Sequence, residues 1–203
     1  MDSSITRGLY RDITEFAAST PQWVQKGMEI WTEAGILIFG VLFVAVWWRA
    51  RGGSTSDISL AVLAPLGTAV GYVVSESLKT FFDEERPCRT VTEAAASIAT
   101  CPPYGDWSFP SNHSAIAGAA AVALLLARPR LAWLTVPMGL SIGYSRVFLG
   151  VHYPHDVIVG LLVGGVAAAA FMLLLAGPAA KLFITMRTSG NGLVLWFAGP
   201  GRR

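Results

Sequence analysis

The chain has 203 residues, of which 53% are hydrophobic and only 14% charged, and its formal net charge is +2. With a mean hydropathy of +0.53, it carries more apolar side chain than a soluble domain of this length can keep from water. A soluble fold is therefore excluded, and the excess apolar surface is expected to face lipid.

The first 27 residues are predicted to form a surface helix. Apolar side chains from Ile5 to Phe16 recur at helical spacing among charged residues, and the pattern ends near Thr20. This is typical of an amphipathic helix lying on a membrane, with a capping helix packed on a bundle as the alternative. The first four residues lack a basic or apolar leader, so no cleavable signal peptide is expected.

Five apolar stretches follow, each close to the length of about 20 residues that crosses a bilayer as a helix. They are residues 30–48, 58–78, 109–127, 131–149 and 156–176, bounded by charge, proline or glycine. A membrane β-barrel would instead show alternating segments of about 10 residues. The predicted fold is an all-α, polytopic transmembrane bundle of about five spans plus the N-terminal surface helix, in one domain over residues 1–203.

Two basic residues, Lys79 and Arg86, stand at the end of the second span, followed by Pro87. Their separation is close to two helical turns, so they share a face if the helix continues. An ammonium beside a planar guanidinium suits phosphate oxygens. Taken alone, however, such residues more often extend to the membrane surface and anchor the helix.

Both cysteines, Cys88 and Cys101, lie in the long loop over residues 79–108. If this loop is extracytoplasmic, a disulfide is expected, and it would stabilise the fold by on the order of 3 kcal/mol. Two free thiols are the alternative, because the sequence does not fix the Cβ geometry.

The third span begins with Pro110, Ser111, Asn112 and His113. Serine and asparagine favour helix N-caps, and a helix start presents free N–H groups and the positive end of its dipole. This pattern indicates an anion pocket with a histidine beside it. A simple helix cap is the alternative, although a cap requires no histidine.

The reversal between the last two spans contains Arg146, His152, Pro154, His155 and Asp156. Proline fits the first turn of a helix, and Asp156 is close enough to accept a hydrogen bond from Nδ1 of His152. That bond would leave Nε2 free as a nucleophile or base, although such pairs are often structural. All three histidines fall at span ends, which favours a site at the lipid–water boundary over a transport pathway.

The distribution of basic residues predicts the orientation of the spans. The segments 49–57, 128–130 and 177–203 have Asp57 as their only acid. Their basic residues are Arg49, Arg51, Arg128, Arg130, Lys181, Arg187, Arg202 and Arg203. These segments, including the 177–203 tail, are expected to be cytoplasmic, and the histidines and the 79–108 loop extracytoplasmic.

Together the three clusters resemble the type 2 phosphatidic acid phosphatase superfamily, or lipid phosphate phosphatases, in its bacterial membrane-integral branch. The family motifs are K-x6-R-P, P-S-G-H and S-R-x5-H-x3-D, in this order. The matching residues, within a catalytic motif region over 79–156, are Lys79, Arg86 and Pro87, then Pro110, Ser111 and His113, then Ser145, Arg146, His152 and Asp156. Asn112 replaces the family's glycine but keeps a backbone N–H, so the departure bears on substrate preference. Most bacterial members have six spans, so the first span here looks shortened or replaced.

The resemblance implies that His152 attacks phosphorus to form a phosphohistidine while Asp156 orients it. His113 would protonate the leaving oxygen and then help to activate water. No metal and no cofactor are implied, and His155, which is extra to the motif, is expected to face solvent. The phosphate oxygens would be held by Lys79, Arg86, Ser111, Asn112 and Arg146.

The predicted function is metal-independent hydrolysis of a lipid phosphate or diphosphate at the extracytoplasmic face of the cell membrane. Undecaprenyl (polyprenyl) diphosphate is the leading substrate, with phosphatidate and phosphatidylglycerol phosphate as alternatives. A non-catalytic membrane protein that binds lipid phosphate, and a vanadate haloperoxidase with a similar site, are less favoured rivals. The expected partners are the bilayer and its lipid phosphate, without nucleic acid; Gly-x3-Gly pairs favour packing within one chain but leave a homodimer open.

Overall fold

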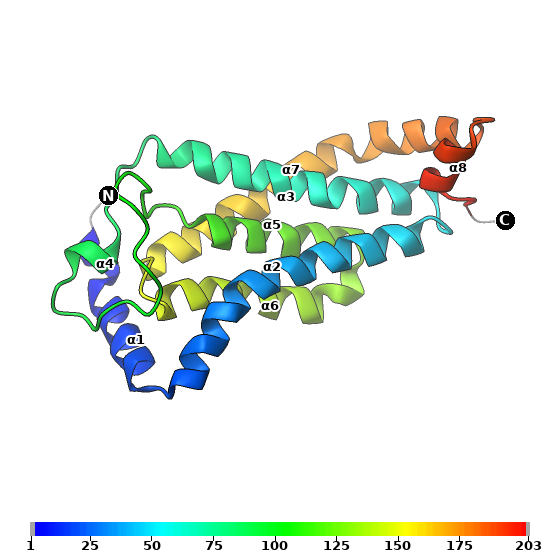
Figure 1. The fold of residues 1–203 in the computed structure, drawn as a ribbon. Helices are drawn as coiled ribbons and strands as arrows, with labels where there is room; N and C mark the ends of the chain where they lie inside the picture. The colour runs from blue at the N-terminus through cyan, green and yellow to red at the C-terminus, as the bar shows by residue number, and fades with distance from the viewer. Residues whose placement is uncertain (1–2, 202–203) are drawn as a thin grey trace.

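Helices make up all of the regular structure in residues 3–201, the part of the chain that this computed structural model describes. Five of them form an elongated bundle: α2 (Gln22–Ala50), α3 (Thr55–Lys79), α5 (Asn112–Ala127), α6 (Ala132–Phe148) and α7 (Pro154–Arg187) (Figure 1). The shorter ones are η1 (Ser3–Thr6), α1 (Arg7–Ser19), α4 (Pro87–Thr90), η2 (Pro129–Leu131) and α8 (Gly192–Ala198). The predicted all-α bundle is confirmed. Residues 1–2 and 202–203, which entered the expectations about a signal peptide and a basic tail, lie outside the described part.

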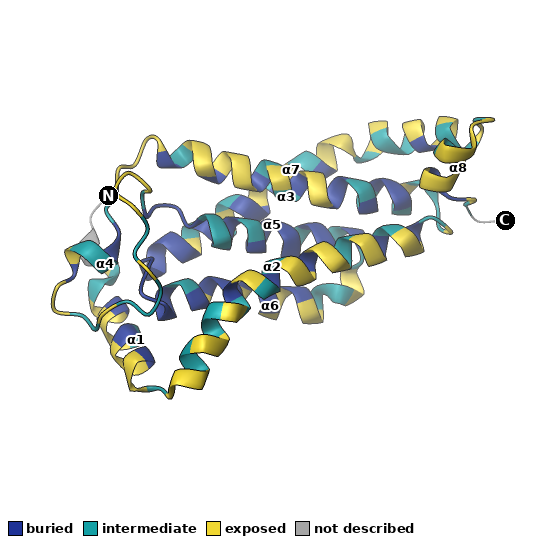
Figure 2. Cartoon of the chain, viewed as in Figure 1, coloured by how far each residue is buried: buried dark blue, intermediate teal, exposed yellow. Residues whose placement is uncertain are grey.

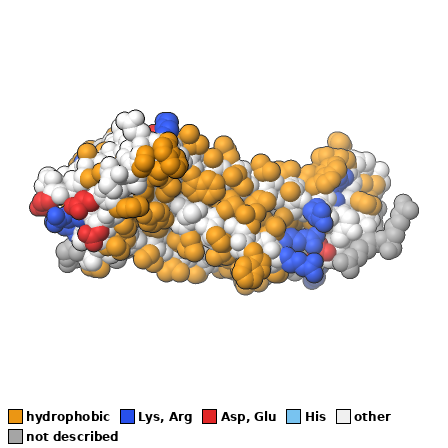
Figure 3. All heavy atoms as spheres, turned by 90° about the horizontal axis from the view of Figure 1, so that it is seen from below, with side chains coloured by type: hydrophobic (Ala, Val, Ile, Leu, Met, Phe, Trp, Pro, Cys, Tyr) orange, Lys and Arg blue, Asp and Glu red, His pale blue; other side chains and the backbone are white. Residues whose placement is uncertain are grey.

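The bundle has the apolar surface of a membrane protein. Helices α2, α3 and α7 are each long and apolar enough to cross a bilayer, whereas α5 has 16 residues and α6 has 17. Buried residues predominate on α5, and α2 and α3 turn exposed residues outward (Figure 2). Apolar side chains cover the middle of the face in Figure 3, and basic side chains gather near one end. The chain is therefore a multi-pass membrane protein, and its five bundle helices correspond to the five predicted spans.

Small residues let α5 and α7 pack almost backbone to backbone. A Cβ added to Gly164 would lie 2.0 Å from the carbonyl oxygen of Ala115, and one added to Gly118 would lie 2.3 Å from that of Leu161. Without a hydrophobic driving force between helices in lipid, such close contact is what holds a membrane bundle together. These contacts lie within one chain, which is the packing that the Gly-x3-Gly pairs favoured.

Two predicted boundaries need correction. Residues 22–27, assigned to the surface segment, form the start of α2, because no proline interrupts the chain between Pro21 and the end of the helix at Ala50. Residues 177–187, assigned to the tail, continue α7 through Pro178, since neighbouring groups in a membrane helix tolerate an internal proline. Residues 192–198 of the tail form α8, and Arg187, at the end of α7, donates hydrogen bonds to the carbonyl oxygens of Ala198 and Gly53.

The N-terminal helix α1 packs across the end of the bundle and also exposes an apolar face. Tyr10 and Ala17 are each only 1% exposed, and the Tyr10 hydroxyl donates to the carbonyl oxygen of Gly150 at 2.9 Å. Leu9 and Phe16 stay more than half exposed. The helix therefore combines the two predicted alternatives, because one face caps the bundle and the other is free to contact lipid.

Candidate active site

The predicted site residues meet at the end of the bundle that carries α1 and α4 (Figure 1). They surround a cavity of about 520 Å³. Of the eight residues expected at the site, six line this cavity: Lys79, Arg86, Asn112, His113, Arg146 and His152. The other lining residues are Tyr72, Glu76, Pro102, Asp106 and Ile116. The clusters that are separate in the sequence therefore form one pocket.

His152 lies in the tight turn between α6 and α7, and its ring is held at both nitrogens. Gly150 makes the turn with a φ of +80°, which a side chain would strain. Nδ1 of His152 lies 3.3 Å from Oδ2 of Asp156, and Nε2 lies 3.1 Å from Nη1 of Arg86. Because a guanidinium only donates, Nε2 offers its lone pair, and the hydrogen is on Nδ1.

The surroundings of His152 keep its ring neutral. Burial in the first place, and then the charges of Arg86 and Arg146, hold the pKa of His152 well below that of a free histidine. A neutral ring with an unprotonated Nε2 is the form in which histidine acts as a nucleophile.

Asp156 lies behind His152, away from the cavity. Its Oδ2 accepts a hydrogen bond from the backbone N–H of Tyr153 at 2.8 Å and another from the hydroxyl of Ser108. Ser108 Oγ also lies 3.4 Å from Nδ1 of His152. Ser108 thus joins His152 and Asp156 as a third residue of this hydrogen-bonded group. The sequence did not predict it, because neither motif spacing nor helical period singles it out.

Asp106, which was also not predicted, occupies the space between the cations. Its Oδ1 lies 3.1 Å from Nζ of Lys79 and 2.9 Å from Nη2 of Arg86. Burial opposes ionisation of this carboxyl, but the charges of Arg86 and Lys79 outweigh burial and lower its pKa. A carboxylate oxygen therefore bridges the two cations that the sequence analysis assigned to phosphate.

Arg146 reaches the cavity with spare hydrogen-bonding capacity. Its Nη1 donates to Oγ1 of Thr32 at 3.3 Å, whereas its buried Nε has no hydrogen-bond partner among the described residues. A planar guanidinium with an unused donor is suited to an anion in the cavity.

His113, in the first turn of α5, pairs with a carboxylate from another helix. Its Nε2 lies 3.0 Å from Oε1 of Glu33 on α2. Glu33 falls near the start of the predicted span over residues 30–48, and no motif there singled it out. The cavity thus holds two histidines, each next to its own carboxylate.

Of the two residues before His113, Asn112 lines the cavity but bonds to α3, and Ser111 caps its own helix. Asn112 accepts from the Ser75 hydroxyl at 2.8 Å and donates to Glu76, which ties α5 to α3 at the rim. Ser111 is fully buried as the N-cap of α5, and its Oγ lies 3.0 Å from the Ser114 hydroxyl. The structure does not bring the Ser111 hydroxyl to the cavity, because capping the helix uses it.

Two further expectations concern residues outside the cavity. His155 was expected to face solvent but is buried. The turn at the start of α7 directs its ring toward the loop after α3, where Nε2 lies 3.1 Å from Oε1 of Glu84. Cys88 and Cys101 are joined by a disulfide, with their Cα atoms 6.0 Å apart, and this bond closes the loop that carries residues 89–100.

Comparisons with known proteins agree with the motifs. Residues 60–177, more than half of the chain, match the family described as the PAP2 superfamily. The chain is 31% identical over 133 residues to the undecaprenyl-diphosphatase BcrC of Bacillus subtilis, and the match covers 65% of each protein. Less than two thirds of that relative is therefore spanned.

Two solved structures share the fold. Aquifex aeolicus LpxE superposes with a TM-score of 0.67 at 22% identity, over 85% of this chain and 97% of that one. A transmembrane PAP2-type phosphatidylglycerolphosphate phosphatase from Bacillus subtilis gives 0.58 at 18% identity, over 89% of each chain. With the three motifs gathered in one pocket and more than half of the chain matched, this chain belongs to the PAP2 superfamily.

Proposed function

We propose that this protein hydrolyses a lipid phosphate or diphosphate through a phosphohistidine formed on His152. The observation that carries the proposal is the setting of this ring, with Asp156 on Nδ1 and a cation-lined cavity in front of Nε2. Phosphoryl transfer depends on positioning and on stabilisation of charge more than on covalent chemistry by the protein. The pocket supplies both.

In the first step, Nε2 of His152 attacks phosphorus and the bond from phosphorus to the leaving oxygen breaks. Lys79, Arg86 and Arg146 stabilise the negative charge on the phosphoryl oxygens. His113 gives its proton to the leaving oxygen, so that the lipid product departs neutral at that atom. Asp156 accepts the Nδ1 hydrogen bond, which strengthens as the ring becomes positively charged.

In the second step, water attacks the phosphohistidine and the P–N bond breaks. His113, now unprotonated, takes a proton from the water, and inorganic phosphate leaves. Glu33 holds the His113 ring in place for both steps through the 3.0 Å contact. No step requires a metal ion, in keeping with the expectation from the family motifs.

Undecaprenyl diphosphate is the proposed substrate, with the site at the extracytoplasmic face of the membrane. The name of the Bacillus subtilis relative supports this choice, and the basic segments at the other end of the bundle support the orientation. Tyr72 and Ile116 give the cavity an apolar wall toward the spans, which suits a substrate whose tail stays in lipid. Phosphatidate and phosphatidylglycerol phosphate are the alternatives.

The test is phosphate release by the purified protein in lipid nanodiscs with EDTA present. Undecaprenyl diphosphate, phosphatidate and phosphatidylglycerol phosphate are compared at equal surface density. We expect the diphosphate to be hydrolysed fastest, with loss of turnover and of an acid-labile phosphoenzyme in His152→Ala. Full activity of that variant would refute the mechanism, and binding of these lipids without turnover by the unmodified protein would identify a non-catalytic binding protein.

A further inference from the structure

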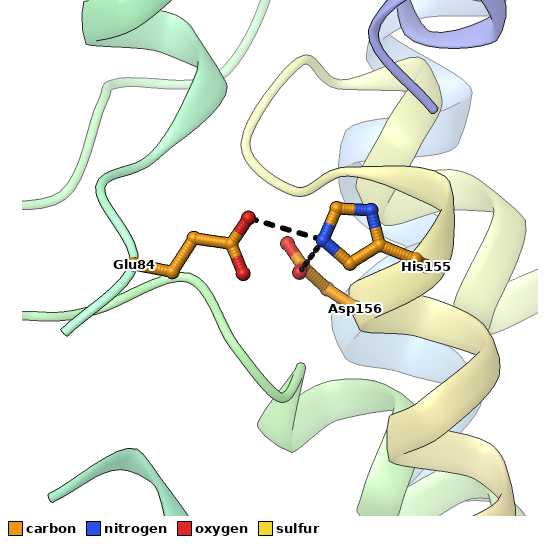
Figure 4. A group of neighbouring side chains, drawn as sticks. All are labelled: Glu84, His155 and Asp156. Carbon is orange, nitrogen blue, oxygen red and sulfur yellow. Dashed lines mark hydrogen bonds and ion pairs between the residues drawn. The ribbon is translucent and has the colours of Figure 1, made fainter. Parts of the chain in front are cut away.

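A buried cluster of Glu84, His155 and Asp156 lies behind His152, outside the cavity (Figure 4). Glu84 comes from the loop after α3, and the other two residues come from the first turn of α7. Figure 4 shows the Glu84 carboxylate and the His155 ring pointing toward one another from these two segments, with Asp156 beside them. The reaction steps above use Asp156 but neither of its neighbours.

The His155 ring is fixed on every side. Nε2 lies 3.1 Å from Oε1 of Glu84 and 3.3 Å from Oδ1 of Asp156. Nδ1 lies 2.7 Å from the hydroxyl of Thr6, a residue of η1. The ring of Tyr153 stacks on it at 5.3 Å between centroids and 14° between planes. A ring held in this way cannot turn without breaking several contacts at once.

The two oxygens of Asp156 have different partners. Oδ2 takes the hydrogen bonds from His152, Ser108 and the Tyr153 backbone. Oδ1 is buried and has no directed hydrogen bond among the described residues, and its close polar contact is the ion pair with Nε2 of His155. Without that contact, Oδ1 would be a buried acceptor with no polar partner, which is costly.

Glu84 holds the cluster in two ways. Its carboxylate is only 3% exposed and takes the directed hydrogen bond from Nε2 of His155. Its backbone carbonyl oxygen accepts the N–H of Ser108 at 2.8 Å, and Ser108 is the residue whose hydroxyl donates to Asp156. One residue therefore positions the partners of both oxygens of Asp156.

We propose that His155 and Glu84 are positioning residues that fix the orientation of Asp156, and through it the attacking nitrogen of His152. The chain Glu84–His155–Asp156–His152 extends the pair on which the proposed function rests. His155 holds Oδ1, so the carboxylate cannot rotate, and Oδ2 stays aligned with Nδ1 of His152. A nucleophile held less firmly reacts more slowly, although the cavity binds phosphate as before.

The experiment compares four variants with the unmodified protein in nanodiscs. His155→Phe keeps a flat ring for Tyr153 but removes the donor, whereas His155→Gln keeps an N–H near the position of Nε2. Glu84→Gln removes the charge at nearly constant shape. Glu93→Gln is the matched control, because Glu93 is an exposed carboxylate that follows α4 within the same 79–108 segment. Size-exclusion profiles and thermal scans establish which variants are folded.

We expect kcat to fall about tenfold to a hundredfold in His155→Phe, with KM and the vanadate inhibition constant within twofold of the unmodified protein. His155→Gln should recover most of the loss, Glu84→Gln should lower kcat in the same way, and Glu93→Gln should change nothing. Adding Glu84→Gln to His155→Phe should cause little further loss, because Glu84 acts through His155.

Unchanged kcat in folded His155→Phe would overturn the proposal, as would an equal loss in His155→Gln. If His155→Phe does not fold, Glu84→Gln carries the test by the same criteria. Loss of activity of the unmodified protein after EDTA, restored by Zn²⁺, would also overturn it, since a metal ion would then link the three side chains. An unmodified protein without any turnover would instead refute the proposed function, so the two failures are distinguishable.

Discussion

Replacing Asp106 with asparagine should strengthen the binding of phosphate-like anions. In the structure, Oδ1 of Asp106 lies 3.1 Å from Nζ of Lys79 and 2.9 Å from Nη2 of Arg86. An anion that binds both cations must displace this oxygen or share its partners. The Asp106→Asn variant keeps the shape but removes the competing charge, so the cations are more available.

The size of the effect follows from the exposure of Asp106, whose side chain is 45% exposed. Solvent screens such ion pairs, so each contributes about 0.5 to 1 kcal/mol rather than the larger value of a buried pair. Two pairs together give about 1 to 2 kcal/mol, which corresponds to about a fivefold to thirtyfold change in affinity.

The assay is competitive inhibition by orthovanadate, with titration calorimetry as an independent measurement of affinity. We expect the inhibition constant to fall by the factor given above in Asp106→Asn and to stay constant in Asp83→Asn, an exposed carboxylate in the preceding loop. An unchanged inhibition constant would refute the reasoning, because Asp106 would then not compete with the anion. A higher inhibition constant would also refute it, because Asp106 would then be holding Lys79 and Arg86 in place for the anion.

Three other predictions concern pH, the disulfide and the packing of the spans. Because the pKa of His152 is lowered, its ring should stay neutral as the pH falls below 6.5. In rates measured from pH 4 to 9, the acid limb of kcat/KM should therefore lie below the pKa of a free histidine, and a limb at or above pH 6.5 would contradict this. Replacing Cys88 and Cys101 by serine should cost about 3 kcal/mol, seen as a lower midpoint in a thermal scan, whereas an unchanged midpoint would mean that the loop adds nothing to stability. Gly164→Ala should separate α5 from α7 and lower the thermal midpoint strongly, because the added Cβ would lie 2.0 Å from the carbonyl oxygen of Ala115. Gly177→Ala on the same helix is the control: its added Cβ would meet no atom within 4 Å, so the change should be neutral or slightly stabilising.

The sequence predicted those features that follow from local pattern. The five bundle helices appeared as apolar runs, since a span needs about 20 apolar residues whatever its neighbours are. Lys79, Arg86, Arg146 and His152 could be assigned to one site because their motifs stand at span ends on one side of the bundle. The Asp156–His152 contact is short-range and follows from a spacing of four residues across a helix start.

Features that depend on the path of the long loop could not be predicted. Asp106, Ser108 and Glu84 lie in a segment without helical period, so nothing local shows which of its side chains turn inward. His155 was expected in solvent because it is extra to the family motif, and its partner Glu84, 71 residues away in the sequence, gives no local signal. Ser111 was assigned to phosphate from its motif, but the choice between capping α5 and facing the cavity depends on tertiary packing.

The docking of the N-terminal segment on the α6–α7 turn has a consequence for how the protein is assembled. Tyr10 bonds to a residue 140 positions later, and Thr6 to one 149 positions later. During synthesis, the first helix reaches the membrane long before its partners exist, and it must already lie on the side where the last turn will emerge. The pocket is therefore complete only when every span has been inserted, so a chain stalled at an earlier stage carries no assembled pocket.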